Sequence, residues 1–164
     1  MIVISDIVFA IRWDIIIEIS ILVLVFLGAI SIATVIITRR LRNTYKDLYR
    51  QQSKFDIELR KSMNLISKVV SVEAFDKYEN VVIKQLSFAE KKELLDLLMN
   101  AFLSVNQEDE NNQYVIETYD NLHEMRRILD SKILAFNQMI SIFPFDFYAK
   151  ILKMKKLPYY THNE

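Results

Sequence analysis

The chain has 164 residues, with 21 basic and 21 acidic side chains, no cysteine, one glycine and two prolines. Because loops usually depend on glycine and proline, their scarcity argues against all-β and α/β folds and predicts an all-α chain with few turns. The lack of cysteine excludes disulfides, thiolate metal sites and cysteine nucleophiles, and it leaves the redox compartment open.

The first predicted element is a transmembrane helix over residues 15–38, preceded by a short segment, residues 1–14. The twenty residues from Ile19 to Thr38 carry no charge, and as a helix they are about 30 Å long, the thickness of the hydrocarbon core of a bilayer. A buried helix of a soluble protein and a cleaved signal peptide are the alternatives. The run is longer than a signal sequence, and no basic region precedes it. We interpret Glu18 as a residue at the membrane boundary, with an intramembrane functional carboxylate as the alternative.

A basic cluster follows the apolar run and predicts the orientation. Arg39, Arg40 and Arg42 come directly after the run, whereas the segment before it contains Arg12 as its single basic residue. By the positive-inside rule, residues 39–164 are expected in the cytoplasm and the N-terminus outside. The same arginines are expected to contact anionic headgroups of the lipid bilayer. We therefore expect a single-pass protein of the plasma (inner) membrane.

A helical body is expected over residues 39–144. From Tyr45 to about Tyr78 the apolar residues recur at spacings of three and four, which is typical of one face of a long amphipathic helix. That face consists of Phe55, Leu59, Met63, Ile66 and Val70. Ser87 and Glu90 match the capping-box pattern, so a second helix is expected to begin there, with a chance match as the alternative. Its buried stripe is expected to be Leu94, Leu97, Leu98, Ala101 and Val105.

The third helix of the body has the clearest periodicity. Apolar residues recur every seven positions, at Val115, Leu122, Leu129, Phe136 and Phe143. Such spacing is typical of a seam packed against another helix, as in a coiled coil. A polar, acidic loop over residues 106–113 precedes this helix, and Pro144 ends it because proline lacks an amide hydrogen. We therefore expect an up-and-down bundle of about three long helices with a short C-terminal helical tail, in which Pro144 lies at the end far from the anchor.

The sequence contains no pattern that predicts catalysis or a cofactor. One glycine cannot make a phosphate-binding loop. His123 and Glu124 begin like the zinc motif H-E-x-x-H, but Arg127 replaces the second histidine. The net charge is +6 over residues 39–70 and −7 over residues 71–121, unlike that of a uniformly basic nucleic-acid-binding protein. We expect no enzymatic activity, no cofactor, no metal and no nucleic-acid partner.

Two stretches carry more specific patterns. The first has Asp-x-x-Leu-basic-basic, a Leu-Ile pair and an aromatic-x-Lys-x-Glu ending, at Asp56, Leu59, Arg60, Lys61, Leu65, Ile66, Phe75, Lys77 and Glu79. The second has two arginines, an aromatic-Asn pair, Phe-Pro and two closing aromatics, at Arg126, Arg127, Phe136, Asn137, Phe143, Pro144, Tyr159 and Tyr160. Together these stretches resemble the LemA family of bacterial membrane-anchored proteins. The resemblance implies a single-pass protein with a helical-bundle body and without an established enzymatic activity or cofactor.

The C-terminal tail, residues 145–164, is crowded with aromatic and basic side chains. Three interpretations are open, namely a cap on the bundle, a segment on the membrane surface, and a docking site for a protein partner. The candidate interaction surface consists of Phe145, Phe147, Tyr148, Lys150, Lys153, Lys155, Lys156, Tyr159 and Tyr160. The acidic loop residues 108–110 are expected to belong to the same surface.

From these features we expect a membrane-anchored scaffold or adaptor that presents helical surface to an unidentified protein partner or to a second copy of itself. A membrane-remodelling or envelope-stress factor that contacts anionic lipid is the alternative. An enzyme is a third reading, which the lack of a nucleophile-base pair or metal cluster argues against. Lipid binding that is lost at high salt would favour the second reading, because exposed charges are screened over about 8 Å at physiological salt.

Overall fold

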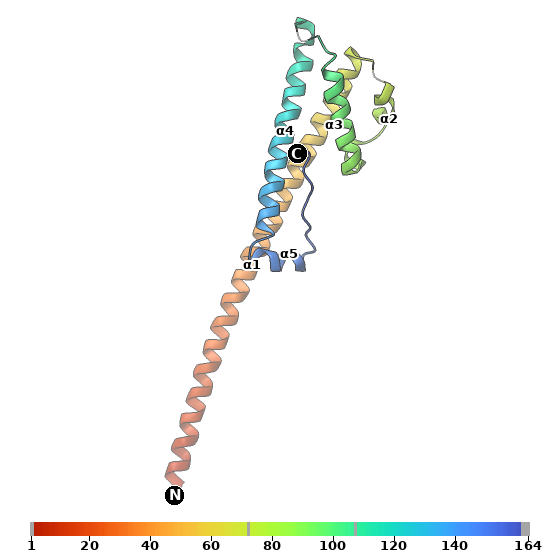
Figure 1. Cartoon of the computed structure of the whole chain (residues 1–164). Helices are drawn as coiled ribbons and strands as arrows, with labels where there is room; N and C mark the ends of the chain where they lie inside the picture. Colours follow the sequence, from red (N-terminus) through yellow and green to blue (C-terminus); the bar gives the residue numbers. More distant parts are fainter. Residues whose placement is uncertain (1, 72, 107, 162–164) are drawn as a thin grey trace. The chain divides into compact units, whose positions relative to one another are not determined.

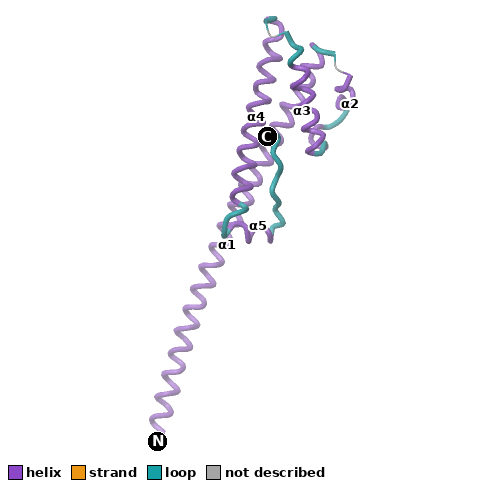
Figure 2. The backbone as a smooth tube through the Cα atoms, viewed as in Figure 1, coloured by secondary structure: helices purple, strands orange, loops and turns teal. Residues whose placement is uncertain are grey.

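The computed structural model of the chain describes residues 2–71, 73–106 and 108–161, with side chains from Trp13 onward. Figure 1 shows the helices in chain order, and Figure 2 shows that the regular structure in these residues is helical, without a strand. The all-α expectation is therefore confirmed for the described residues. The elements are α1 Ile2–Val69, α2 Asp76–Glu79, α3 Phe88–Phe102, α4 Gln113–Met139, α5 Phe145–Ile151 and the 3-10 turns Glu73–Phe75, Ile83–Gln85 and Glu110–Asn112.

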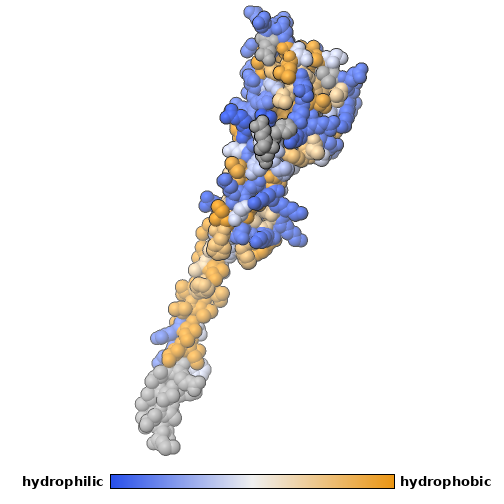
Figure 3. All heavy atoms as spheres, viewed as in Figure 1, coloured by the Kyte–Doolittle hydropathy of each residue, from blue (hydrophilic) through white to orange (hydrophobic). Residues whose placement is uncertain are grey.

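The chain forms two compact units, Met1–Arg42 and Asn43–Glu164, called here unit 1 and unit 2. In unit 1, every residue from Trp13 to Ala33 is exposed. Figure 3 shows the apolar side chains gathered along this part of α1. Among the described residues, α1 is the one helix that is long enough and apolar enough to cross a membrane, by length and composition.

The hydroxyl groups within this apolar part of α1 bond to their own helix. Ser20, Ser31 and Thr34 each donate to the carbonyl oxygen four residues earlier, at 2.7–2.8 Å. Such bonds need neither water nor another protein segment, which is the condition that a polar side chain must meet inside a bilayer.

Unit 2 is organised around a pair of antiparallel helices, α4 and the second part of α1, residues 43–69 (Figure 1). Near the end of α4, Lys132 makes an ion pair with Asp47. Near the start of α4, the carbonyl oxygen of Thr118 accepts a hydrogen bond from Ser62 at 3.4 Å. Rising residue numbers on one helix thus meet falling numbers on the other, and the two helices run in opposite directions.

Most of the predicted apolar faces form the core of unit 2. The buried members are Phe55, Leu59, Met63, Ile66, Leu94, Leu98, Ala101, Val105, Val115, Leu122, Leu129 and Phe136. Val70 and Leu97 are only half-buried. Phe143 is 82% exposed, so its assignment to the seam was wrong. α4 ends at Met139, and the turn that follows takes the next seven-residue position off the helix face.

The first helix of the body ends earlier than predicted. α1 ends at Val69, whereas the prediction continued this helix to about Tyr78. Around Val69, β-branched and polar residues follow one another and lower the helix propensity. The described residues that follow, 73–86, form two 3-10 turns and α2 and run back along α1. We call residues 73–86 the return segment. Arg60 holds this return segment, because its guanidinium donates to the carbonyl oxygens of Tyr78, at 2.8 Å, and Glu79.

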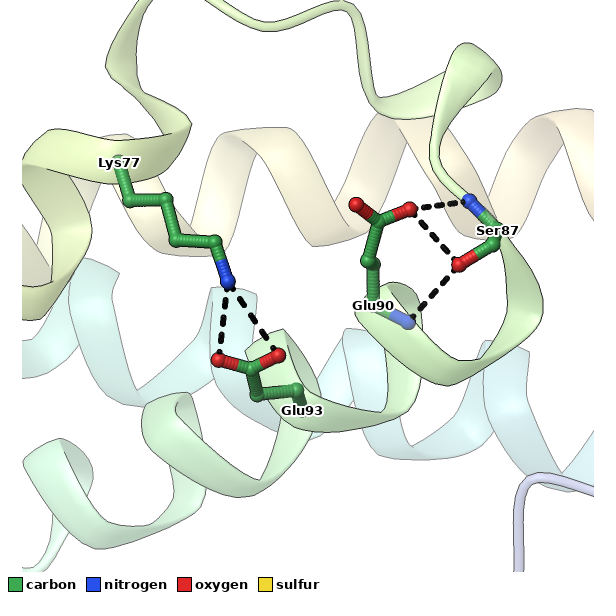
Figure 4. Close-up of polar contacts among 4 residues, drawn as sticks. All are labelled: Lys77, Ser87, Glu90 and Glu93. Atoms are coloured by element: carbon green, nitrogen blue, oxygen red, sulfur yellow. Dashed lines mark hydrogen bonds and ion pairs between the residues drawn. The ribbon is translucent and has the colours of Figure 1, made fainter.

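The predicted capping box at the start of α3 is confirmed (Figure 4). The amide of Glu90 donates to the Ser87 hydroxyl oxygen at 3.3 Å, and the amide of Ser87 donates to the Glu90 carboxylate at 2.7 Å. Beside the box, Lys77 of α2 contacts Glu93 of α3 at 3.2 Å. The box fixes where α3 begins, and the ion pair ties α3 to the return segment.

α3 runs in the same direction as α1, which differs from the expected alternation. Lys91 near its start contacts Asp56 at 2.7 Å. At its end, Phe102 stacks on Tyr119 with 3.7 Å between ring centres, close to the start of α4. The prediction assumed that the second helix brings the chain back, whereas the short segment between α1 and α3 does so.

This direction places the end of α4 where unit 2 begins. Phe136 packs against Tyr45 with 5.7 Å between ring centres, and Tyr45 is the third residue of unit 2. Figure 1 shows α5 at this same end of α4. We call this end of the bundle, where Tyr45 meets Phe136, the Asn43 end of unit 2. The expectation that Pro144 lies at the opposite end of the bundle was therefore wrong.

Described residues of the polar segment before α4 do contribute to the packed interior. Asn112 is buried, and its side-chain amide donates to the carbonyl oxygen of Asn106 at 2.9 Å. The Asp109 carboxylate accepts the amide of Asn111 at 2.9 Å. These bonds close the loop from within, although it contains no apolar side chain.

Candidate interaction surface

The C-terminal tail runs from α5 back along α4. Asn137 of α4 holds the tail through two hydrogen bonds with the backbone of Leu157. The Asn137 side-chain amide donates to the Leu157 carbonyl oxygen at 2.8 Å, and the Leu157 amide donates to the Asn137 side-chain oxygen at 2.9 Å. Further along, the Asp130 carboxylate accepts the amides of Tyr160 and Thr161 at 2.8 and 3.0 Å. The end of the described tail is thus a strap fixed to α4 and not a free segment.

Tyr160 is buried, so its assignment to the interaction surface was wrong. Its ring lies between Phe55 of α1 and Phe88 of α3, with ring centres 4.8 and 4.7 Å away. Burial and the neighbouring carboxylates of Asp56 and Asp130 raise the pKa of the Tyr160 hydroxyl above its usual range. The residue therefore joins α1 and α3 as a neutral aromatic of the core.

A buried ion pair lies next to this aromatic cluster. The side chains of Asp56 and Lys91 are both almost fully buried and approach to 2.7 Å. Burial raises the pKa of the Asp56 carboxyl, and the hydrogen bond from Lys91 opposes that rise. A buried charge is stable only with its partner, so this pair fixes how α3 packs on α1.

The residues that suggested a family resemblance are brought together by the fold. Asn137 and Tyr159, 22 residues apart, approach to 3.2 Å between side-chain amide and hydroxyl. Arg60 contacts the backbone of Glu79, and Asp56 pairs with Lys91. Each of these polar groups holds one segment of unit 2 against another. In the structure these contacts therefore stabilise the fold of unit 2.

The remaining tail residues form an exposed face on and around α5. Phe147, Lys150, Lys153, Lys155 and Lys156 are exposed, whereas Phe145, Tyr148 and Tyr159 are half-buried. Sequence reasoning missed two members of the face. Ile142 and Phe143 are exposed in the turn before α5, and the proline at 144, taken only as a helix stop, was the signal that the heptad pattern no longer applied there.

The acidic loop does not belong to this face. Residues 108–110 precede the start of α4, and α5 follows its end. α4 has 27 residues and is therefore about 40 Å long. The expectation of one combined surface was wrong, because the loop and α5 lie at opposite ends of the same helix.

The basic cluster after the apolar run belongs to unit 1. Arg39, Arg40 and Arg42 are exposed on α1.

In unit 2, His123 packs edge-on against Tyr119, with 4.5 Å between ring centres, and burial lowers the pKa of its imidazole. No group of three or more potential metal-ligating side chains is present in the described residues.

One groove was not anticipated from the sequence. It lies between the second part of α1 and the return segment, in unit 2, and is lined by Ile57, Arg60, Lys61, Asn64, Val82 and Lys84. Ile57 and Val82 are exposed there. Three basic side chains and the carboxylates of Asp56 and Glu79 line the same groove, so it offers apolar surface together with charges of both signs.

No family model, no curated protein and no solved structure matches this chain. The resemblance to the LemA family therefore stays a prediction from the two residue patterns.

Proposed function

We propose that this chain is a single-pass, membrane-anchored helical scaffold or adaptor of LemA type, with unit 2 in the cytoplasm and no catalytic activity. The proposal rests on the apolar part of α1, which the rest of the described protein leaves uncovered. A monomeric soluble protein rarely exposes apolar surface of this extent. A bilayer covers it fully, and the hydroxyls in this part already bond to their own helix.

The cytoplasmic position of unit 2 is supported by the arginines that follow the apolar run. Arg39, Arg40 and Arg42 are exposed, and basic residues beside a transmembrane helix favour the cytoplasmic side. The membrane-anchored helical body also agrees with what the LemA resemblance implies. Arg60, Asn137 and Tyr159, which stand at resembling positions, hold segments of unit 2 together.

The groove beside α1 is the surface that suits a protein partner or a second copy of the chain. Its exposed apolar residues, Ile57 and Val82, lie on segments that Arg60 holds together through backbone carbonyls. A groove with fixed walls can bind without a large ordering cost. Lys61, Lys84 and Glu79 line it as well, so a partner segment with both acidic and basic side chains would complement its charges.

Site-specific photo-crosslinking in intact cells tests the proposal. A photoreactive residue at Val82 should give one discrete adduct in the membrane fraction, whereas the same residue at the exposed Glu124 of α4 should give none. Co-expression of two differently tagged copies distinguishes the partners, since an adduct with both tags is a self-association. Absence of any adduct from Val82, or the same diffuse adducts from both positions, would contradict the scaffold role.

The alternative is a membrane-remodelling or envelope-stress factor that acts through anionic lipid. The lysine-rich face around α5 favours it. A factor of this kind should change the permeability or shape of anionic vesicles at a low protein-to-lipid ratio. An inert anchor-and-scaffold protein should leave both unchanged.

A further inference from the structure

The surface around α5 has an apolar face without a protein partner among the described residues. Ile142, Phe143, Phe147 and Ile151 are 60%, 82%, 56% and 61% exposed. Phe147 and Ile151 are four residues apart and lie on one side of α5, whereas Ala149 on the other side is buried. We call these four exposed residues the α5 face.

Basic side chains accompany the α5 face in the sequence. Lys150, Lys153, Lys155 and Lys156 are exposed, and residues 142–161 carry a net charge of +3, with Asp146 as their one acidic residue. Asp146 lies 3.5 Å from Lys150. Lysine stems cover apolar surface while their ammonium groups stay in the polar layer. Exposed apolar side chains combined with several lysines are typical of segments that lie in the interface of an anionic membrane.

Covalent connection keeps the α5 face close to the bilayer of the proposed anchor. Phe136, near the end of α4, packs on Tyr45, and Tyr45 comes seven residues after Thr38, the end of the uncharged run. Seven residues span at most about 25 Å in any conformation. Tyr45, against which the end of α4 packs, is therefore tethered within that distance of Thr38.

The composition of the face favours an anionic lipid surface. Each apolar side chain partitions into a bilayer interface on its own, and each lysine adds attraction to anionic headgroups.

We propose that the α5 face inserts into the anionic leaflet of the membrane that α1 crosses, with Lys150, Lys153, Lys155 and Lys156 among the headgroups. This contact would be a second attachment in the same chain and would hold unit 2 against the membrane surface. It rests on the proposed anchor, and it goes beyond it by naming the lipid chemistry and the residues that bind it.

The natural absence of cysteine allows a direct test on the full chain. Phe147→Cys, and Asp120→Cys on the exposed side of α4 as a control, are each labelled with an environment-sensitive fluorophore. The labelled chains are reconstituted as single copies in lipid nanodiscs of phosphatidylcholine, with or without about one quarter phosphatidylglycerol. Because each nanodisc holds one copy, no second protein can shield the probe.

In anionic nanodiscs the probe at position 147 should emit at shorter wavelength than the probe at 120. Lipids with a spin label in the acyl chain should quench it several-fold more strongly, and aqueous iodide several-fold less. Replacing all four lysines by glutamine should reduce the difference between anionic and neutral nanodiscs. A circular dichroism melt of each variant confirms that unit 2 is folded.

Equal quenching of both probes in anionic nanodiscs would overturn the proposal. So would shielding of position 147 that appears only when discs hold two copies, since that result assigns the face to self-association. Failure of the anchor is a separate outcome, because a chain that does not co-purify with the nanodiscs contradicts the proposed function itself. A chain that stays in the disc with an exposed position 147 contradicts only the lipid contact of α5.

Discussion

Two stretches of the same helix, α1, meet opposite surroundings. Between Trp13 and Ala33 all side chains are exposed, and nearly all of them are apolar. Between residues 43 and 69, polar residues separate the apolar ones, and Phe55, Leu59, Met63 and Ile66 are buried. Both stretches have the same backbone structure.

This comparison shows that the side-chain pattern, and not the helical backbone, determines which environment each stretch of α1 suits. A helix that is apolar on all sides fits lipid, and a helix with one apolar stripe fits a protein core. The hydroxyls follow the same division. Ser31 in the first stretch bonds only to its own helix at 2.8 Å, whereas Ser62 in the second donates to Thr118 of α4.

A charge placed in the buried stripe of α1 should have the largest effect on the stability of unit 2. Leu59→Asp puts an unpaired carboxylate in the core at a side chain that is 0% exposed, at a penalty of several kcal/mol, similar to the whole stability of a small domain. We expect the cooperative thermal transition of unit 2, followed by circular dichroism of the full chain in detergent, to disappear. Leu129→Asp in the facing seam should behave in the same way.

The matched control for this change is Ile57→Asp, two residues earlier on the same helix. Ile57 is 65% exposed, so its replacement should change the free energy of unfolding by less than about 0.5 kcal/mol. Equal melting temperatures for the two variants would show that the stripe is not a core face.

The buried pair of Asp56 and Lys91 is the next most sensitive point. Lys91→Met leaves the Asp56 carboxylate buried without its partner, which should destabilise unit 2 by about 3–5 kcal/mol. Asp56→Leu combined with Lys91→Met removes both charges and should restore most of that loss. Denaturant titration of the three proteins measures the difference, and a double variant as unstable as Lys91→Met would contradict the pairing.

The strap formed by the tail should respond more weakly. Asn137→Ala removes three hydrogen bonds to Leu157 and Tyr159, at a cost of about 1–3 kcal/mol. The tail should then be released, and trypsin should cut faster after Lys155 or Lys156. Gln138→Ala, at an exposed neighbouring position, is the control. Identical digestion of the two variants would show that Asn137 does not hold the strap.

The capping box should give the smallest effect. Ser87→Ala should lower the free energy of unfolding by about 1 kcal/mol, while Ser131→Ala, exposed on α4, should change it by less than about 0.5 kcal/mol. The hydrogen bonds from Ser87 lower the pKa of Glu90 below its ordinary value of 4.5. The stabilisation from these hydrogen bonds is therefore present above pH 4.5 and is lost as the pH falls through the lowered pKa of Glu90. The difference in free energy of unfolding between wild type and Ser87→Ala should accordingly become smaller in acid.

Local patterns in the sequence predicted the helices and their buried faces well. Spacings of three, four and seven describe positions on one helix, and Leu59 and Leu129 were placed correctly by such spacing alone. The capping box is equally local, since Ser87 and Glu90 are three residues apart. Phe143 shows the limit of this approach, because the count of seven continues in the sequence after the helix has ended.

Contacts between distant segments could not be predicted in the same way. Asp56 and Lys91 are 35 residues apart, and no periodicity connects them. The direction of α3 depends on the segment between α1 and α3, whose described residues form two 3-10 turns and the four-residue helix α2, too short for a periodic pattern. Tyr160 looked like part of an exposed aromatic and basic tail, and its burial depends on Asp130, which holds its backbone amide.

Membrane fractionation of the intact chain tests the difference between the two stretches most directly. Cell membranes are washed with alkaline carbonate, which removes peripheral proteins, and are collected by ultracentrifugation. We expect the chain to remain in the membrane pellet and to require detergent for release, because the proposed function places the stretch from Trp13 to Ala33 in lipid. Recovery of the intact chain in the supernatant without detergent would contradict the membrane anchor.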